Sequence, residues 1–407
     1  MKPEVKLTLF IFLISIVLGC AVVISRAKNT SGNILSPFAK GSSLFSLFGR
    51  HEKPKKIIYG YFPYWNFEKI KYLRLDELTH LAYFGIYLEE NGNFEKTAIG
   101  EDGSIVFEPG YKNWKESKEL GSLIEKCKQE GVRVALTVIA HTDEKIDNFL
   151  DCKECWNTLL NNLVMELNVR GIKDVNLNFE YAGETDPKRA VEFSELTKFV
   201  NEQLDSIYGD SFVVASAFAD SAQAQRVSSD LDNLGRNADG IFIMGYDFHR
   251  PQSDEIGPVA PISGNKQNIT SILNDFLTKV PPNKIILGVP YYGYNWVVKS
   301  DDPNAKTLKD ADDNPRAQSQ PYESVMDTIL DTDPEVKWNE EGKSPYFTYT
   351  SPETGELRTV YFENKDSLRA KYQLVKDANL AGVGIWALGY DGGYNELWDL
   401  LYDEFIR

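Results

Sequence analysis

Polar side chains alternate with apolar ones near the end of a β-rich run, at Asn176, Asn178 and Glu180. Alternate residues of a strand point to the same face, so these three side chains share one face and the apolar residues between them share the other. Aromatic surroundings would desolvate the charged form of Glu180, raise its pKa and keep it protonated near neutral pH, as a general acid requires. The pattern predicts an acid at Glu180; the alternative is a glutamate in a salt bridge on the rim of the fold.

Cysteine and histidine are too few to build a metal centre. The chain has four histidines, and Cys152-x-x-Cys155 lacks the second cysteine pair that a zinc site needs. We therefore expect no metal and no cofactor. The two cysteines are interpreted as ordinary or mutually bonded surface thiols, with a redox pair as the alternative.

Eight short β-rich runs alternate with helical segments. The strands are expected at residues 57–62, 79–87, 132–139, 174–181, 212–218, 240–247, 284–291 and 382–388. Helices are expected at residues 154–169, 187–207, 265–280 and 365–378. The alternation implies right-handed βαβ units, and eight of them close into a (β/α)8 TIM barrel, an α/β fold. An open doubly wound sheet is the alternative, but no glycine-rich phosphate motif follows any strand.

The interval between the seventh and eighth expected strands is too long for one helix. It contains about 90 residues, and a small α+β insertion at about residues 296–364 accounts for the excess. Its aromatic residues surround a hairpin-like pair of segments, 346–350 and 358–362. Active sites of such barrels lie at the carboxyl ends of the strands, where Glu180 is expected. An insertion beside the barrel mouth would deepen that groove.

The sequences of several expected strands resemble those of glycoside hydrolase family 18, the chitinase-like barrels. KDVNLNFEY at 173–181 is similar to the family signature D-G-x-D-x-D-x-E, in which the glutamate is the acid. Other segments resemble further parts of the family pattern, in the right order: YGYF at 59–62, MGYD at 244–247 with GPVAP at 257–261, LGVPYYG at 287–293 and GVGIWALGYD at 382–391. The resemblance covers about residues 56–407 and is closer in style to bacterial cell-wall and spore-type members than to secreted chitin degraders.

This resemblance implies roles for the site residues. Glu180 would protonate the glycosidic oxygen while the 2-acetamido group of the substrate attacks the anomeric carbon, so no second carboxylate acts as nucleophile. Tyr246 would hold the acetamido group with Asp247 beside it, and Trp386 would form the floor of the reacting sugar's subsite. The remaining predicted site residues are Asn178 beside the acid and, for substrate binding, Tyr61, Asn176, Met244 and Tyr292. Barrel packing is the alternative role for Tyr246 and Trp386, and a loop start for Asp247.

Three positions depart from the family signature, because Lys173, Asn176 and Asn178 stand where it has aspartate. The position next to the acid matters most. An aspartate there orients the acetamido N–H, offsets the positive charge of the oxazolinium ring and helps to keep the glutamate protonated. Asn178 can accept the N–H hydrogen bond but carries no negative charge. A rate lower by roughly 10²–10³-fold is expected from such a loss.

The net charge indicates which partners to expect, and the amino-terminal sequence indicates the compartment. With 60 acidic and 44 basic residues the formal charge is −16, which argues against a nucleic-acid partner. Residues 7–24 form an uncharged run of about 27 Å as a helix, so residues 1–25 are predicted to be a transmembrane signal-anchor. Residues 26–55 are a flexible linker that leads to an extracytoplasmic barrel at 56–407. The alternatives are secretion after signal cleavage near Ala27 and a lipoprotein at Cys20.

Two functions are consistent with these observations. The first is a glycosidase that acts on β-1,4-linked N-acetylglucosamine glycans, either chitin oligomers or peptidoglycan. The second is a non-catalytic, lectin-like glycan-binding protein on the same barrel. Glu180, Tyr246 and Trp386 together favour the enzyme, whereas the loss of the aspartates favours the binder. No sequence feature predicts an oligomeric state.

Overall fold

The computed structural model describes residues 53–100, 102–264, 267–314 and 316–407. The predicted signal-anchor and most of the predicted linker lie outside the described residues. Within those described ranges, no helix combines the length and the apolar character needed to cross a membrane.

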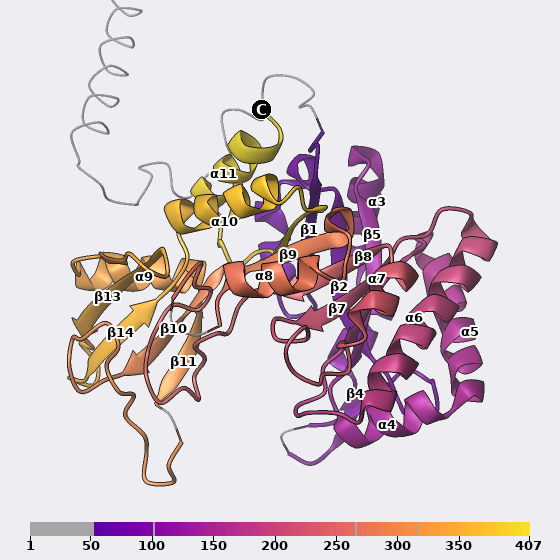
Figure 1. Ribbon diagram of the computed structural model, residues 1–407, viewed down its shortest axis with the longest axis horizontal. Coiled ribbons are helices and arrows are strands. Elements are labelled where there is room, and N and C mark those ends of the chain that lie inside the picture. The colour runs from indigo at the N-terminus through magenta and orange to yellow at the C-terminus, as the bar shows by residue number, and fades with distance from the viewer. Residues whose placement is uncertain (1–52, 101, 265–266, 315) are drawn as a thin grey trace, which may run out of the picture.

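Eight parallel strands form one closed barrel, which confirms the predicted (β/α)8 architecture (Figure 1). In order around the barrel they are β1 (Ile57–Pro63), β2 (His80–Tyr87), β5 (Arg133–Ala140), β6 (Asp174–Phe179), β7 (Val213–Phe218), β8 (Gly240–Met244), β9 (Ile285–Pro290) and β15 (Gly382–Trp386). The barrel closes where β1 pairs in parallel with β15, from Ile57 opposite Gly382 to Gly60 opposite Ile385. Each observed strand overlaps one of the eight expected runs.

Helices cover the outside of the barrel. They are α2 (Pro109–Glu116), α3 (Lys118–Glu130), α4 (Asp143–Asp151), α5 (Lys153–Arg170), α6 (Pro187–Tyr208), α7 (Leu231–Asn237), α8 (Ile269–Leu277), α10 (Lys365–Asp377) and α11 (Glu396–Phe405). Among the described residues, two short 3₁₀ segments lie between β1 and β2, η2 (Phe67–Tyr72) and η3 (Leu75–Glu77), and a third, η4 (Pro282–Lys284), lies between α8 and β9. Helix α8 is shorter than expected because Asn268 caps its amino-terminus, accepting from the Ser271 N–H.

Aromatic and aliphatic side chains fill the barrel interior. Phe242, on β8, is fully buried and packs against Tyr61 with the ring centroids 4.8 Å apart. Two glycines make room for it: a Cβ at Gly384 would lie 2.0 Å from the Phe242 ring, and one at Gly288 would lie 2.6 Å from it. Because side chains occupy the interior, a ligand can bind only at the barrel mouth.

A second sheet follows β9 and precedes α10, in the interval where an α+β insertion was expected. Its strand order is β11 (Ala317–Pro321), β10 (Tyr292–Val297), β14 (Leu357–Tyr361), β13 (Ser344–Thr350) and β12 (Lys337–Asn339), and it carries helix α9 (Tyr322–Thr332). β13 and β14 are the expected hairpin, paired antiparallel. Figure 1 shows this sheet to one side of the barrel. β10 was not predicted, because only Tyr291 separates it from β9 and no turn signal interrupts the run.

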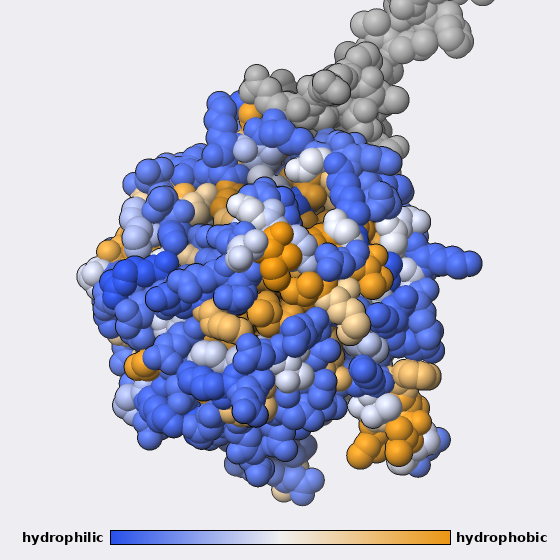
Figure 2. Space-filling view, turned by 90° about the vertical axis from the view of Figure 1, so that its right-hand side faces the viewer, coloured by the Kyte–Doolittle hydropathy of each residue, from blue (hydrophilic) through white to orange (hydrophobic). Residues whose placement is uncertain are grey.

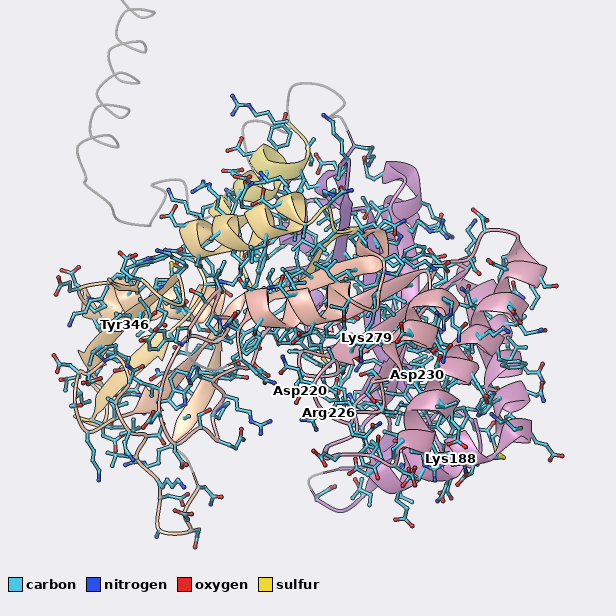
Figure 3. All side chains as sticks on the ribbon, in the orientation of Figure 1. Lys188, Asp220, Arg226, Asp230, Lys279 and Tyr346 are labelled. Carbon is cyan, nitrogen blue, oxygen red and sulfur yellow. A yellow bond between two sulfur atoms is a disulfide. The ribbon has the colours of Figure 1, made fainter. Side chains whose placement is uncertain are left out.

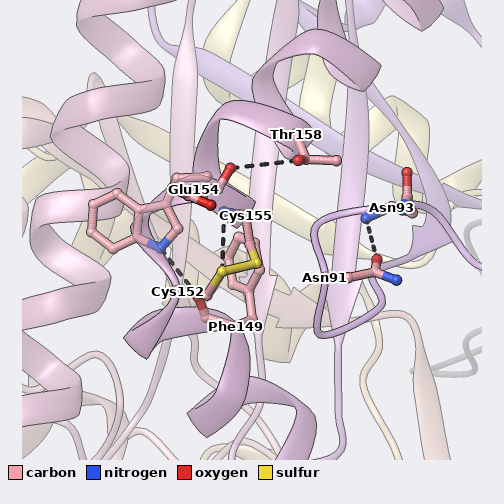
Figure 4. Close-up of a disulfide and its surroundings, with 8 residues drawn as sticks. Asn91, Asn93, Phe149, Cys152, Glu154, Cys155 and Thr158 are labelled. Carbon is pink, nitrogen blue, oxygen red and sulfur yellow. Dashed lines mark hydrogen bonds between the residues drawn. A yellow bond between two sulfur atoms is a disulfide. The ribbon is translucent and has the colours of Figure 1, made fainter.

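A disulfide joins Cys152 to Cys155 at the junction of α4 and α5 (Figure 4). The two cysteines are therefore mutually bonded, one of the two forms expected for them as ordinary thiols. Cys127 is a buried free thiol on α3.

The face shown in Figure 2 is mostly hydrophilic, but apolar side chains gather near its centre and on a projection at its lower right. A two-stranded hairpin, β3 (Thr97–Ile99) and β4 (Ile105–Phe107), exposes Ile99, Ile105 and Phe107. Helices α5 and α6 expose further apolar residues: Met165, Val169, Val191 and Ile207.

Candidate active site

A pocket of about 690 Å³ lies at the carboxyl ends of the barrel strands and reaches the second sheet. This volume falls within the roughly 300–1,000 Å³ typical of small-ligand sites. Eight of the nine predicted site residues line it: Tyr61, Asn178, Glu180, Met244, Tyr246, Asp247, Tyr292 and Trp386. The second sheet contributes Tyr292 and Tyr294 from β10 and Ser319 from β11.

The ninth predicted residue, Asn176, is not among the pocket-lining residues. It is fully buried and donates to the Val214 carbonyl and to Ser216 Oγ, both at 3.2 Å. Tyr61 shares Ser216 through its hydroxyl, also at 3.2 Å. Asn176 therefore links β6 to β7 beneath the pocket, and its partner Ser216 lines the pocket together with Tyr61.

Strand β6 and the register of its neighbour place the proposed acid. Glu180 follows the last residue of β6, and its N–H donates to the Ala140 carbonyl at the end of β5, 2.8 Å away. Asn178 Nδ2 donates to Glu180 Oε1 at 2.7 Å. No hydrogen bond from the described part of the chain reaches Glu180 Oε2 or Asn178 Oδ1. One oxygen of each side chain is thus available to a ligand.

His141 is a site residue that the sequence analysis did not identify. Its Nε2 lies 3.1 Å from Glu180 Oε1 and 3.3 Å from Asn178 Nδ2. It follows β5 directly, and the pairing of Ala140 with Phe179 brings it opposite Glu180. The signal was available: a histidine one residue past the third barrel strand lies beside the corresponding residue of the fourth.

The sequence-based expectation of a raised pKa at Glu180 is wrong for the unliganded protein. Burial does raise the pKa, but the hydrogen bond and the positive charge of His141, together with the Asn178 amide, outweigh it and leave the pKa below its usual value. The charge of His141 contributes only while the imidazole is protonated. The expectation was based on aromatic enclosure of Glu180 alone, without the neighbouring His141.

Tyr246 and Asp247 extend the site from the end of β8. The Tyr246 hydroxyl makes no hydrogen bond within the described part of the chain and lines the pocket, so it is available to a ligand. Asp247 Oδ1 accepts hydrogen bonds from the hydroxyls of Tyr292 and Tyr294, the latter at 2.8 Å. Burial raises the pKa of Asp247, and these hydroxyls oppose that effect. Its φ of 62° is unusual for a residue other than glycine and is typical of functional positions.

Trp386 ends β15 and presents an aromatic surface to the pocket. It packs edge-on against Phe84, with centroids 4.7 Å apart, and against Tyr61 at 5.6 Å. Trp65, nearly half exposed, lies 6.4 Å from it. A rigid aromatic cluster of this kind suits the apolar face of a pyranose ring.

Charged side chains complete the pocket wall. Arg226 binds the carboxylate of Asp220 through Nε and Nη2, at 3.0 and 2.7 Å, and both residues line the pocket. Figure 3 shows this pair on the side of the barrel toward the second sheet. Among the described residues, no group of three or more His, Cys, Asp or Glu side chains is arranged to hold a metal ion.

A (β/α)8 barrel with a glutamate, a tyrosine and an aspartate in one aromatic pocket at its strand ends has the architecture of a barrel glycosidase. Residues 57–391 match the family model described as Glycosyl hydrolases family 18. The chain belongs to this family, and it is a glycosidase. The resemblance found in the sequence is thereby confirmed.

Relatives with curated names include the cortical fragment-lytic enzyme of Bacillus subtilis (strain 168), 26% identical over 338 residues, which cover 81% of this chain and 68% of the relative. The di-N-acetylchitobiase of Mus musculus is 26% identical over 205 residues, or 48% of this chain and 56% of the relative. The solved structure of the Bacillus cereus spore cortex-lytic enzyme SleL has a TM-score of 0.67 at 18% identity, covering 88% of this chain and 75% of the other. At that identity the likeness supports the fold alone.

Proposed function

We propose that this glycosidase hydrolyses β-1,4-linked N-acetylglucosamine glycans by a substrate-assisted, retaining mechanism. The observation that carries the proposal is the convergence of Glu180, Tyr246, Asp247 and Trp386 on one pocket. Relatives named as a cortical fragment-lytic enzyme and as di-N-acetylchitobiases support this class of substrate. Peptidoglycan and chitin oligomers are the two candidates.

Each group has a place in the proposed reaction. The reacting sugar stacks on Trp386, and protonated Glu180 gives its proton from the free Oε2 to the glycosidic oxygen as the C1–O bond breaks. The 2-acetamido oxygen attacks C1 and forms an oxazolinium ion. The Tyr246 hydroxyl holds the acetamido group, and Asn178 Oδ1 accepts its N–H. Water then attacks C1 as the C1–O bond of the oxazolinium ring breaks, and it gives a proton to the Glu180 carboxylate. Two inversions at C1 leave the anomeric configuration retained.

Purified full-length protein in mild detergent tests the proposal with two substrates, a fluorogenic chitobioside and peptidoglycan. We expect turnover of at least one, lost in the Glu180→Gln variant. Preference between fluorophore release and muropeptide release identifies the substrate. Binding of both glycans without turnover of either would contradict the proposal and support the lectin-like alternative.

We also propose that residues 1–25 anchor the chain in a membrane, that 26–55 form a linker, and that the barrel at 56–407 works outside the cytoplasm. The Cys152–Cys155 disulfide supports this placement, because disulfides persist mainly in oxidising compartments. The full-length chain should stay with membranes after high-salt and carbonate washes. A soluble processed form beginning near Lys28 would instead indicate signal cleavage.

A further inference from the structure

The imidazole of His141 lies where it can act on the proposed acid directly. Its Nε2 is 3.1 Å from Glu180 Oε1, and the exposed fractions of the two side chains are 36% and 32%. The carboxyl ends of the paired strands β5 and β6 fix this contact, since Ala140 lies opposite Phe179 and accepts the Glu180 N–H. The position beside the acid carries Asn178, which supplies no charge.

We infer that His141 is the positioning residue that sets the protonation of Glu180, at a site where no aspartate stands beside the acid. This inference rests on the proposed function of Glu180 as general acid. In this inference His141 acts through Glu180 and not through a contact of its own with the glycan.

The His141 imidazole and the Glu180 carboxyl are close enough to share one proton. While His141 is protonated, its charge and its N–H stabilise the Glu180 carboxylate. When His141 loses its proton, burial acts with less opposition and favours the protonated carboxyl. Over the pH range in which the pair holds one proton, the fraction of Glu180 that is protonated becomes independent of pH. The pair therefore levels the pH dependence of the acid over that range.

Ionisable groups from several neighbouring elements surround the pair. Tyr87 of β2 packs edge-on against His141 with centroids 5.8 Å apart, and burial raises its pKa to about 12. Burial also raises the pKa values of Tyr61 and Tyr246, so these phenols stay neutral at the relevant pH. Asp247, after β8, repels the Glu180 charge, and Asp220, which also lines the pocket, is paired with Arg226. On α4, Lys145 pairs with Glu95.

The test compares the pH profile of kcat/KM in the wild type with that of His141→Gln, whose amide can still donate to Glu180 but carries no charge. We expect a flat wild-type profile that falls as His141 deprotonates, and a variant with a single fall at lower pH. The variant should be faster by about fivefold or more on the acidic side of the profile, and the two rates should converge on the alkaline side. A control, His249→Gln, changes another pocket histidine and should keep the wild-type profile shape. A purely structural role for His141 predicts one scale factor at every pH, which would overturn the inference.

A second readout does not depend on activity. In protein labelled with ¹³C at the Glu carboxyl, the resonance that is missing from Glu180→Gln identifies Glu180. The pKa of that carboxyl should be higher in His141→Gln than in the wild type, because burial remains and the cation is gone. An upward shift without any hydrolysis would support the His141 coupling and contradict the proposed function. An unchanged titration would overturn the inference whatever the activity.

Discussion

The structure makes a detailed prediction for Asn178→Asp, which restores the carboxylate of the family signature. The new carboxylate oxygen would replace Nδ2, which lies 2.7 Å from Glu180 Oε1 and 3.3 Å from His141 Nε2. A hydrogen bond between the two carboxyl groups then requires a proton, so Glu180 should hold its proton more tightly. The added charge also stabilises the oxazolinium ion.

The magnitude follows from the geometry. Two unit charges about 4 Å apart repel by about 4 kcal/mol at an effective dielectric constant of about 20. Solvent reduces this value because the Glu180 side chain is 32% exposed, and the nearby His141 offsets part of it. About a third of the full repulsion, or roughly 1.4 kcal/mol, corresponds to a tenfold gain in rate. The gain should be largest near neutral pH, because at low pH the wild-type acid is already protonated.

The assay is kcat/KM for the fluorogenic chitobioside across pH, for Asn178→Asp alone and in the His141→Gln background. Without His141 the repulsion between the carboxylates is no longer offset, so the gain should be larger in the double variant. A wild type already as fast as ordinary chitinases, and slowed by Asn178→Asp, would refute this reasoning. It would show that the site manages the developing charge without a carboxylate at this position.

Three further predictions concern the pocket and the fold. Tyr246→Phe should lower kcat by roughly tenfold or more while leaving the melting temperature unchanged, because its hydroxyl makes no hydrogen bond within the described part of the chain; an unstable variant would contradict this. Trp386→Ala should weaken oligosaccharide binding by roughly 1–3 kcal/mol in calorimetric titration, and unchanged affinity in the folded variant would place the glycan elsewhere. Lys371→Met should lower the free energy of unfolding, measured by denaturant titration, by roughly 3 kcal/mol. The reason is that the fully buried Glu363 loses the ammonium group that lies 2.7 Å from its Oε2. Adding Glu363→Gln should recover most of that loss.

The barrel could be predicted from the sequence because its strands are short β-rich runs separated by helical periodicity. The same alternation correctly placed Asn178 and Glu180 on the face that meets the pocket. Asn176 obeys this pattern too, yet it is fully buried beneath the pocket, where it donates to Ser216, a residue that it shares with Tyr61. Alternation specifies a face of a strand but not a depth along it.

The features that were missed depend on contacts between distant segments. β10 continues the apolar run of β9, so nothing local marked it as a strand of a different sheet. The contact between His141 and Glu180 joins residues 39 positions apart and follows from the register of β5 against β6. Without that register, the sequence does not place a histidine beside the acid, and the expected direction of the Glu180 pKa shift was wrong.

The central claim, that Glu180 is the proton donor for glycan cleavage, is tested most directly by Glu180→Gln. The amide keeps the size of the side chain but cannot protonate the leaving oxygen. Turnover of the chitobioside and release of muropeptides should both be abolished, while oligosaccharide affinity, measured by calorimetry on the same preparation, stays within a few-fold of the wild type. A Glu180→Gln protein that still hydrolyses either substrate at a rate near that of the wild type would contradict the account.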